Sequence, residues 1–262
     1  MLLDELIVDQ GKIDILKKYI EQNEHRLKWK KEYVKLFANF YAKRCGHVTK
    51  ALQLWKNIAE ENYDFSTLED LADYYSLIGK KDEFDALLSR VKDDFNTKGK
   101  LRIDLMSAEC HCDYEQIFKV LKALDSEKSY EYEFFTREMY ALLCKGDFET
   151  VYQRSNKMLN DITVYGDRDS CDIINYEIAR KESKRNIQSE KLTDIISRDV
   201  TTPLKVAAFL LLGKQKNAET LIESDIKFNF IAANQYLTTF VFKKYLDDRI
   251  KCKLKDKLKG IH

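Results

Sequence analysis

The chain of 262 residues has 45 basic and 44 acidic side chains, 44% hydrophobic residues, only 8 glycines and a single proline. A β-sheet protein of this length needs many more turn residues, so the composition favours helices joined by tight turns. The net charge of +1 argues against a nucleic-acid partner, because such partners are bound mainly by neutralising phosphates.

Turn residues recur along the chain at a nearly constant spacing. Glycines at positions 11, 46, 79, 146 and 213 are separated by 35, 33, 67 and 67 residues. Cys112 divides the first long interval into 33 and 34 residues, and a turn within 181–185, near Lys181, divides the second. We therefore predict turns near Gly11, Gly46, Gly79, Cys112, Gly146, Lys181 and Gly213, which define about six to seven helix hairpins over residues 1–224.

The residues around these turns repeat as well. The positions four residues before each marked turn and five and nine residues after it are apolar, with Ser155 the exception. They are Ile7, Leu16, Ile20, Ala42, Ala51, Trp55, Tyr75, Phe84, Leu88, Ala108, Ile117, Leu121, Leu142, Val151, Ser155, Phe209, Ala218 and Ile222. At 3.6 residues per turn, each helix of a pair has one apolar face. The outer face of a hairpin is covered only by the next hairpin, so we expect the units to stack.

The ends of the chain differ from the repeats. Thr201 and Pro203 predict a helix start ten residues before Gly213. Residues 225–262 lose the pattern, and we expect C-terminal capping helices there, the last one rich in lysine. A surface for an acidic partner or a membrane is the alternative for those lysines. Few residues precede Gly11, so we expect a fragment of a longer protein or an N-terminal hairpin that packs on a partner.

Two segments, Gly46…Ala51…Trp55 and Leu71-Ala72…Tyr75…Gly79, resemble the tetratricopeptide repeat, a helix-turn-helix unit of 34 residues. Alanine five residues after the turn is kept only at Ala51 and Ala218, and the family's frequent closing proline is missing. The resemblance implies an all-α, right-handed solenoid of stacked antiparallel hairpins, with related helical repeats as the alternative. In that family, ligand peptides lie in a concave groove lined by the first helix of each pair.

Carried through the repeat, the resemblance gives a set of candidate groove residues. Those that we expect to bind a partner are Tyr33, Phe40, Glu69, Asp73, Lys100, Arg102 and Tyr140. They would combine aromatic ends with an acidic band beside a basic one, which suits a protein segment of complementary charge. In the alternative interpretation, the aromatic rings pack between helices, and the acids pair with Lys100 or Arg102.

Catalytic and metal-binding motifs are weak in this sequence. Cys110-His111-Cys112 lacks the two spaced pairs of ligands that a zinc site needs, and sequence neighbours on a helix rarely face each other. The chain has no glycine-rich phosphate loop. We therefore expect no catalytic residue, no metal and no cofactor. The alternatives are an RNA-binding helical repeat and an enzyme that uses Cys112 as nucleophile.

Cysteine content and the N-terminus bear on location. The six cysteines do not suggest a disulfide framework, and the acidic start of the chain is unlike a signal peptide. The longest apolar run, 206–212, is too short for a membrane span. We expect a cytoplasmic, non-catalytic scaffold or sensor module that binds a protein or peptide segment. By analogy of fold, such arrays in bacteria often form the ligand-sensing part of larger signalling or defence proteins.

Overall fold

The computed structural model describes residues 10–27, 30–56, 63–126, 132–159, 166–227 and 229–261, and every regular element in these ranges is a helix. In chain order the elements are α2 (Gln10–Leu27), α3 (Lys31–Asn39), the π-helix η1 (Phe40–Cys45), α4 (Val48–Trp55), α5 (Phe65–Leu77), α6 (Lys81–Val91), the short 3₁₀ turn η3 (Lys92–Asp94), α7 (Thr97–His111), α8 (Tyr114–Ser126), α9 (Tyr132–Lys145), α10 (Phe148–Leu159), α11 (Asp167–Glu182), α12 (Ser189–Ser197), α13 (Thr202–Leu211), α14 (Gln215–Ile226), α15 (Phe230–Thr238), α16 (Phe240–Tyr245) and α17 (Asp248–Leu258). The prediction of an all-α chain is confirmed for these ranges. None of the helices described has the length and apolarity needed to cross a membrane.

Within the described ranges, six connections between consecutive helices contain a residue with positive φ. These residues are Gly46 (70°), Gly79 (69°), Cys112 (55°), Gly146 (83°), Lys184 (58°) and Gly213 (72°). In five of them the amide after this residue donates to the carbonyl five residues earlier, as from Asp147 to Leu142, which closes the preceding helix. Lys184 lies in the interval where the sequence predicted an unmarked turn. Gly11, by contrast, lies inside the first turn of α2.

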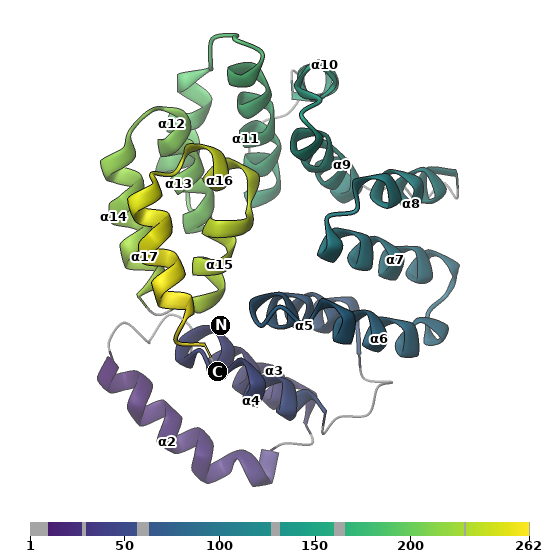
Figure 1. Ribbon diagram of the computed structural model, residues 1–262, viewed down its shortest axis with the longest axis vertical. Coiled ribbons are helices and arrows are strands. Elements are labelled where there is room, and N and C mark those ends of the chain that lie inside the picture. The colour runs from purple at the N-terminus through teal and green to yellow at the C-terminus, as the bar shows by residue number, and fades with distance from the viewer. Residues whose placement is uncertain are drawn as a thin grey trace.

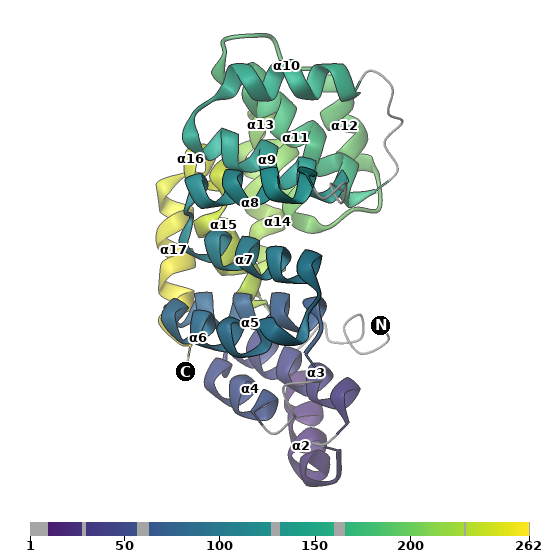
Figure 2. The ribbon, with the colours of Figure 1, turned by 90° about the vertical axis from the view of Figure 1, so that its right-hand side faces the viewer.

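The helices on the two sides of each of these turns pack against each other, and each pair also contacts the next (Figure 2). The residue five positions after the turn is buried in α4, α6, α8, α10 and α14, as the repeat predicts. These residues are Ala51, Phe84, Ile117, Val151 and Ala218. A small or branched apolar side chain at this position lets the paired helix approach closely, and burial of the larger ones contributes about 1.5–3 kcal/mol each.

The last helices of the chain return to the first ones, so that the helices are arranged in a ring (Figure 1). α15 packs against η1 and α5, and Ile231 joins the buried apolar cluster of the N-terminal helices. The ring of Phe230 lies so close to Gly46 that a Cβ added there would be 3.1 Å away from it. This contact between residues far apart in the sequence places α15 and α16 opposite the middle helices.

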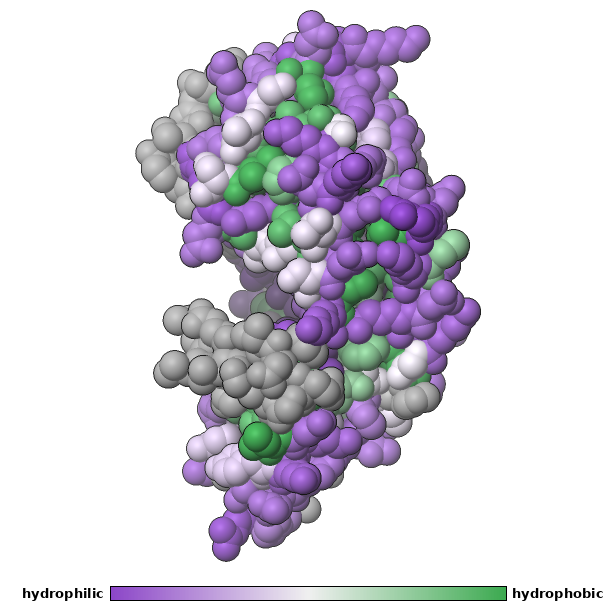
Figure 3. Space-filling view, turned by 90° about the vertical axis from the view of Figure 1, so that its left-hand side faces the viewer, coloured by the Kyte–Doolittle hydropathy of each residue, from purple (hydrophilic) through white to green (hydrophobic). Residues whose placement is uncertain are grey.

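The lysine-rich last helix, α17, lies along the outside of this C-terminal part. Its apolar side, with Ile250 and Leu254, is buried, and the helix packs on α15. Two of its cations pair with α14, at 2.9 Å from Arg249 to Glu219 and at 2.7 Å from Lys253 to a second glutamate, Glu223. Figure 3 shows the side of the molecule with the C-terminal helices, where hydrophobic residues form only small patches.

Candidate binding cavity

A cavity of about 700 Å³ lies on the inner side of the ring, between the middle helices and the connection from α15 to α16. α5, α7 and α9, the first helices of three successive pairs, form one side of it. Thr238, Thr239 and Lys243 form the other side. The inner surface of the array is therefore partly covered by the C-terminal segment of the same chain.

The wall formed by α5 is acidic. Glu69, Asp70 and Asp73 line the cavity together with Ser66 and Ser76, because residues three or four positions apart share one face of a helix. Burial raises the pKa of Asp73 to about 6, an effect to which the neighbouring carboxylates add and which Lys43 opposes. A carboxyl group with such a pKa is half-protonated slightly below neutral pH.

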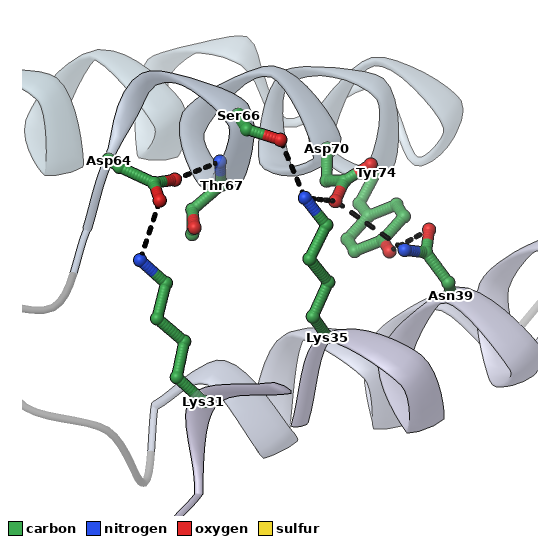
Figure 4. A network of polar contacts seen from close by, with 8 residues as sticks. All are labelled: Lys31, Lys35, Asn39, Asp64, Ser66, Thr67, Asp70 and Tyr74. Atoms are coloured by element: carbon green, nitrogen blue, oxygen red, sulfur yellow. Dashed lines mark hydrogen bonds and ion pairs between the residues drawn. The ribbon is translucent and has the colours of Figure 1, made fainter. Parts of the chain in front are cut away.

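Asp70 differs from Asp73 because α3 already supplies its partners (Figure 4). The Lys35 ammonium lies 3.5 Å from the Asp70 carboxylate and 2.6 Å from the Ser66 hydroxyl. The amide of Asn39 is also within 3.5 Å of Asp70, and its oxygen accepts a hydrogen bond from Tyr74. These contacts connect the first two pairs of helices and fix the rotation of α5 that directs its acidic face into the cavity.

Arg137 on α9 connects the three inner helices. Its guanidinium contacts the carboxylate of Glu109 on α7 at 2.5 Å and that of Glu69 on α5 at 3.3 Å. A guanidinium group is suited to this bridging role, because its planar fork donates in several directions. Lys81 donates to the carbonyl of Cys110 at 2.5 Å and so borders the same space.

Tyr140 on α9 connects this wall to the opposite one. Its hydroxyl accepts a hydrogen bond of 3.2 Å from the amide of Phe240, at the start of α16. The Phe240 ring packs on Phe148 with 6.2 Å between the centroids. Burial raises the pKa of Tyr140, with a smaller contribution from Cys144, so the hydroxyl stays protonated at neutral pH.

A second, apolar pocket of about 360 Å³ continues the cavity between α11, α13 and α16. Ile174, Ile178, Leu204, Ala207 and Phe242 provide most of its apolar wall. It shares Glu109, Arg137, Tyr140 and Thr239 with the polar cavity. The two spaces are therefore one continuous surface with a polar end and an apolar end, and we refer to them below as the polar cavity and the apolar pocket.

Burial affects three of the thiols near these spaces. Cys112 and Cys144 line a further pocket beside Tyr140. Burial raises the pKa of Cys144 and of Cys110, and it raises the pKa of Cys171 to about 11. A thiol with a raised pKa stays protonated, and the protonated form is a poor nucleophile and metal ligand.

His111, the middle residue of Cys110-His111-Cys112, faces α6 rather than its cysteine neighbours. Its Nε2 atom lies 2.6 Å from the carboxylate of Asp85. Together with Asp82 these side chains form a group whose candidate ligand atoms lie within 4.8 Å of one another, on the surface of the molecule. This contact joins the second helix of one pair to the first helix of the next.

Three of the seven candidate partner-binding residues line the polar cavity. They are Glu69, Asp73 and Tyr140. Arg102 lies beside them, with its guanidinium over the rings of Phe65 at 4.9 Å and Phe134 at 5.5 Å. This stacking holds Arg102 at the edge of the acidic wall.

The other three candidates lie elsewhere. Phe40 is only 5% exposed and packs against Tyr41 in the N-terminal core, with 5.7 Å between ring centroids. Lys100 pairs with Asp93 at 2.8 Å. Tyr33 is 38% exposed on α3 and does not line the polar cavity or the apolar pocket.

Arg137, Thr239 and Lys243 are cavity residues that the sequence did not indicate. Arg137 lies three residues before Tyr140, which the sequence did indicate, so the same helical period places both on one face of α9. Thr239 and Lys243 had no such signal, because they follow the segment where the repeat is lost. Comparison with family models, with curated proteins and with solved structures found no match for this chain.

Proposed function

We propose that this chain is a tetratricopeptide-like solenoid that acts as a non-catalytic, cytoplasmic interaction module and binds a protein segment on its inner surface. The observation that supports this most strongly is the continuity of the polar cavity and the apolar pocket. Both are lined by the first helices of successive pairs, which is where the resemblance places ligands. Their volumes of about 700 and 360 Å³ fall in the range of about 300–1,000 Å³ that is typical of ligand sites.

The helix pairs support the solenoid interpretation. Five turns share the same hydrogen bond, and each pair packs on the next, as expected for stacked hairpins. The closure of the ring by α15 narrows the concave side to a space for a short segment. We therefore propose a partner that inserts a few residues, rather than a long helix that follows the whole groove.

Peptide selection on the intact chain tests this function. A phage-displayed library of random dodecapeptides is selected on the wild-type protein, and the selected peptides are measured by fluorescence anisotropy. Ser76→Trp fills the polar cavity from α5 and is expected to weaken binding at least about tenfold, or 1.4 kcal/mol. Ser89→Trp is the matched control, because Ser89 is exposed on α6 of the same pair and lines none of these spaces.

Two results would contradict the proposal. If no peptide is selected above background, the chain does not bind short linear segments. If the selected peptides bind Ser76→Trp as tightly as Ser89→Trp, they bind elsewhere on the molecule. Circular dichroism of both variants shows whether the helical fold is retained.

A further inference from the structure

The carboxylates on α5 are not equally satisfied by the protein. Glu69 is bound by Arg137, and Asp70 is bound by Lys35 and Asn39. Asp73 has no hydrogen-bond or ion-pair partner among the described residues, although it lies in the wall of the polar cavity. An acidic side chain that is mostly removed from water and unpaired is stabilised by a cation that enters the cavity.

The cations around the polar cavity are placed differently. Arg137 contacts two carboxylates, and Lys81 donates to a backbone carbonyl. Lys243 lies on the opposite wall, on α16, where its side chain is exposed to solvent and its charge is screened. Lys43 on η1 also acts on Asp73, but without a hydrogen bond or ion pair to it, so among the described residues no cation binds this carboxylate of α5 directly.

The apolar pocket adjoins the polar cavity. Tyr140 and Arg137 belong to both spaces, so a ligand that passes them reaches from an acidic wall to an aliphatic one. A large apolar side chain that fills the pocket is removed from water. For a Leu or Phe side chain this burial contributes about 1.5–3 kcal/mol to binding. The pocket volume of about 360 Å³ accommodates such a side chain together with part of its backbone.

We propose that the partner segment combines one large apolar residue, seated in the apolar pocket, with a nearby Lys or Arg whose charged group binds Asp73. This inference rests on the proposed function, because it specifies the chemistry of the segment that the same site accepts. The side chain of Lys or Arg suits the position, since its aliphatic stem can follow the wall while the charged end reaches the carboxylate. An acidic residue at that place would meet Glu69 and Asp73 and be repelled.

A peptide array on the full chain tests the chemistry of the segment directly. The probes are octapeptides with Leu or Phe at one position and Lys, Arg, norleucine or Glu at a neighbouring position, with the other positions drawn from Gly, Ala and Ser. The wild-type protein is expected to retain Lys and Arg peptides at least about fivefold more strongly than norleucine and Glu peptides. This difference corresponds to about 1 kcal/mol for one charge-assisted contact.

Two variants separate the two parts of the proposal. Asp73→Asn keeps the shape of the side chain and is expected to reduce the preference for Lys and Arg to less than about twofold, while apolar selectivity remains. Leu204→Asn places a polar group in the wall of the apolar pocket and is expected to weaken all Leu and Phe peptides alike. Asp125→Asn is the matched control for charge, because Asp125 is exposed on α8 and lines neither space.

The outcomes distinguish this inference from the function on which it rests. The array peptides can compete for the site with the library peptides whose binding Ser76→Trp weakens. If they do so but show no preference for a basic residue, the inference is wrong and the proposed function stands. The inference is also overturned if the wild-type protein retains Glu peptides as strongly as Lys and Arg peptides, or if Asp73→Asn keeps the full preference for Lys and Arg. If the wild-type chain retains none of the peptides and none was selected from the random library, the proposed function fails as well.

Discussion

Replacing Asp73 by Asn isolates the effect of one buried carboxyl group on the stability of the fold. Burial raises the pKa of Asp73 from an ordinary 3.8 to about 6, and the neighbouring Asp70 and Glu69 act in the same direction, while Lys43 opposes them. In the unfolded chain these effects vanish and the group ionises near pH 4. The folded protein therefore keeps a proton that the unfolded chain has lost between about pH 4 and pH 6.

The sign of the effect follows from this difference in bound protons. Because the folded state binds more protons, the free energy of unfolding of the wild-type protein falls as the pH rises through this window, and the loss is complete above about pH 6. A shift of about 2 pKa units corresponds to about 3 kcal/mol at 1.36 kcal/mol per unit. Part of the carboxyl group remains in contact with solvent, so we expect a measured difference of about 1–3 kcal/mol.

Urea denaturation followed by circular dichroism measures this difference. The free energy of unfolding of Asp73→Asn minus that of the wild type is expected to be small near pH 4 and to rise by about 1–3 kcal/mol towards pH 7.5. Asp125→Asn, exposed on α8, is expected to show no such rise. The raised pKa of Asp73 is refuted if this difference in the free energy of unfolding stays constant or falls as the pH rises. Asp73 would then ionise in the folded protein as it does in the unfolded chain.

Four further variants test the turns and the closure of the ring. Gly79→Ala is expected to destabilise the fold by about 1 kcal/mol through its positive φ alone. Gly46→Ala is expected to destabilise it by clearly more, because the new Cβ also meets the ring of Phe230. Equal effects of the two variants in thermal unfolding would contradict the contact with Phe230. Lys184→Gly is expected to stabilise the fold by about 0.5–1 kcal/mol, since glycine adopts φ 58° without strain; a lower melting temperature would refute this. Tyr140→Phe removes the acceptor for the first amide of α16, and hydrogen exchange at that amide is expected to accelerate while exchange in α7 stays the same.

The turns show how far local sequence signals determine this fold. Four glycines were visible from their spacing because positive φ favours glycine strongly. At Lys184 the same geometry occurs without glycine, so only the length of the interval indicated a turn. Phe40 shows a different limit. It begins a π-helix, in which the period of 3.6 residues does not hold, so a position extrapolated as groove-facing is buried in the core.

The candidate site was predictable only where it depends on helix periodicity. Glu69, Asp73 and Tyr140 line the cavity because a regular helix directs every third or fourth residue to one side. Thr239 and Lys243 reach the same cavity through the return of α15 to the N-terminal helices. That return depends on contacts between residues more than 150 positions apart, such as Phe230 on Gly46, which a repeat pattern does not encode.

Closure of the ring also changes how stability is distributed along the helices. In an open solenoid the terminal repeats have a single neighbour, so they unfold more readily than the middle. Here α15 contacts η1 and α5, and the hydrogen bond from Phe240 to Tyr140 joins segments 100 residues apart. Unfolding of the C-terminal helices would therefore remove the cover of the N-terminal core and one wall of the cavity at once. A segment bound between α5 and α16 contacts both walls only when the ring is closed, so its binding must favour the closed state over any opened one.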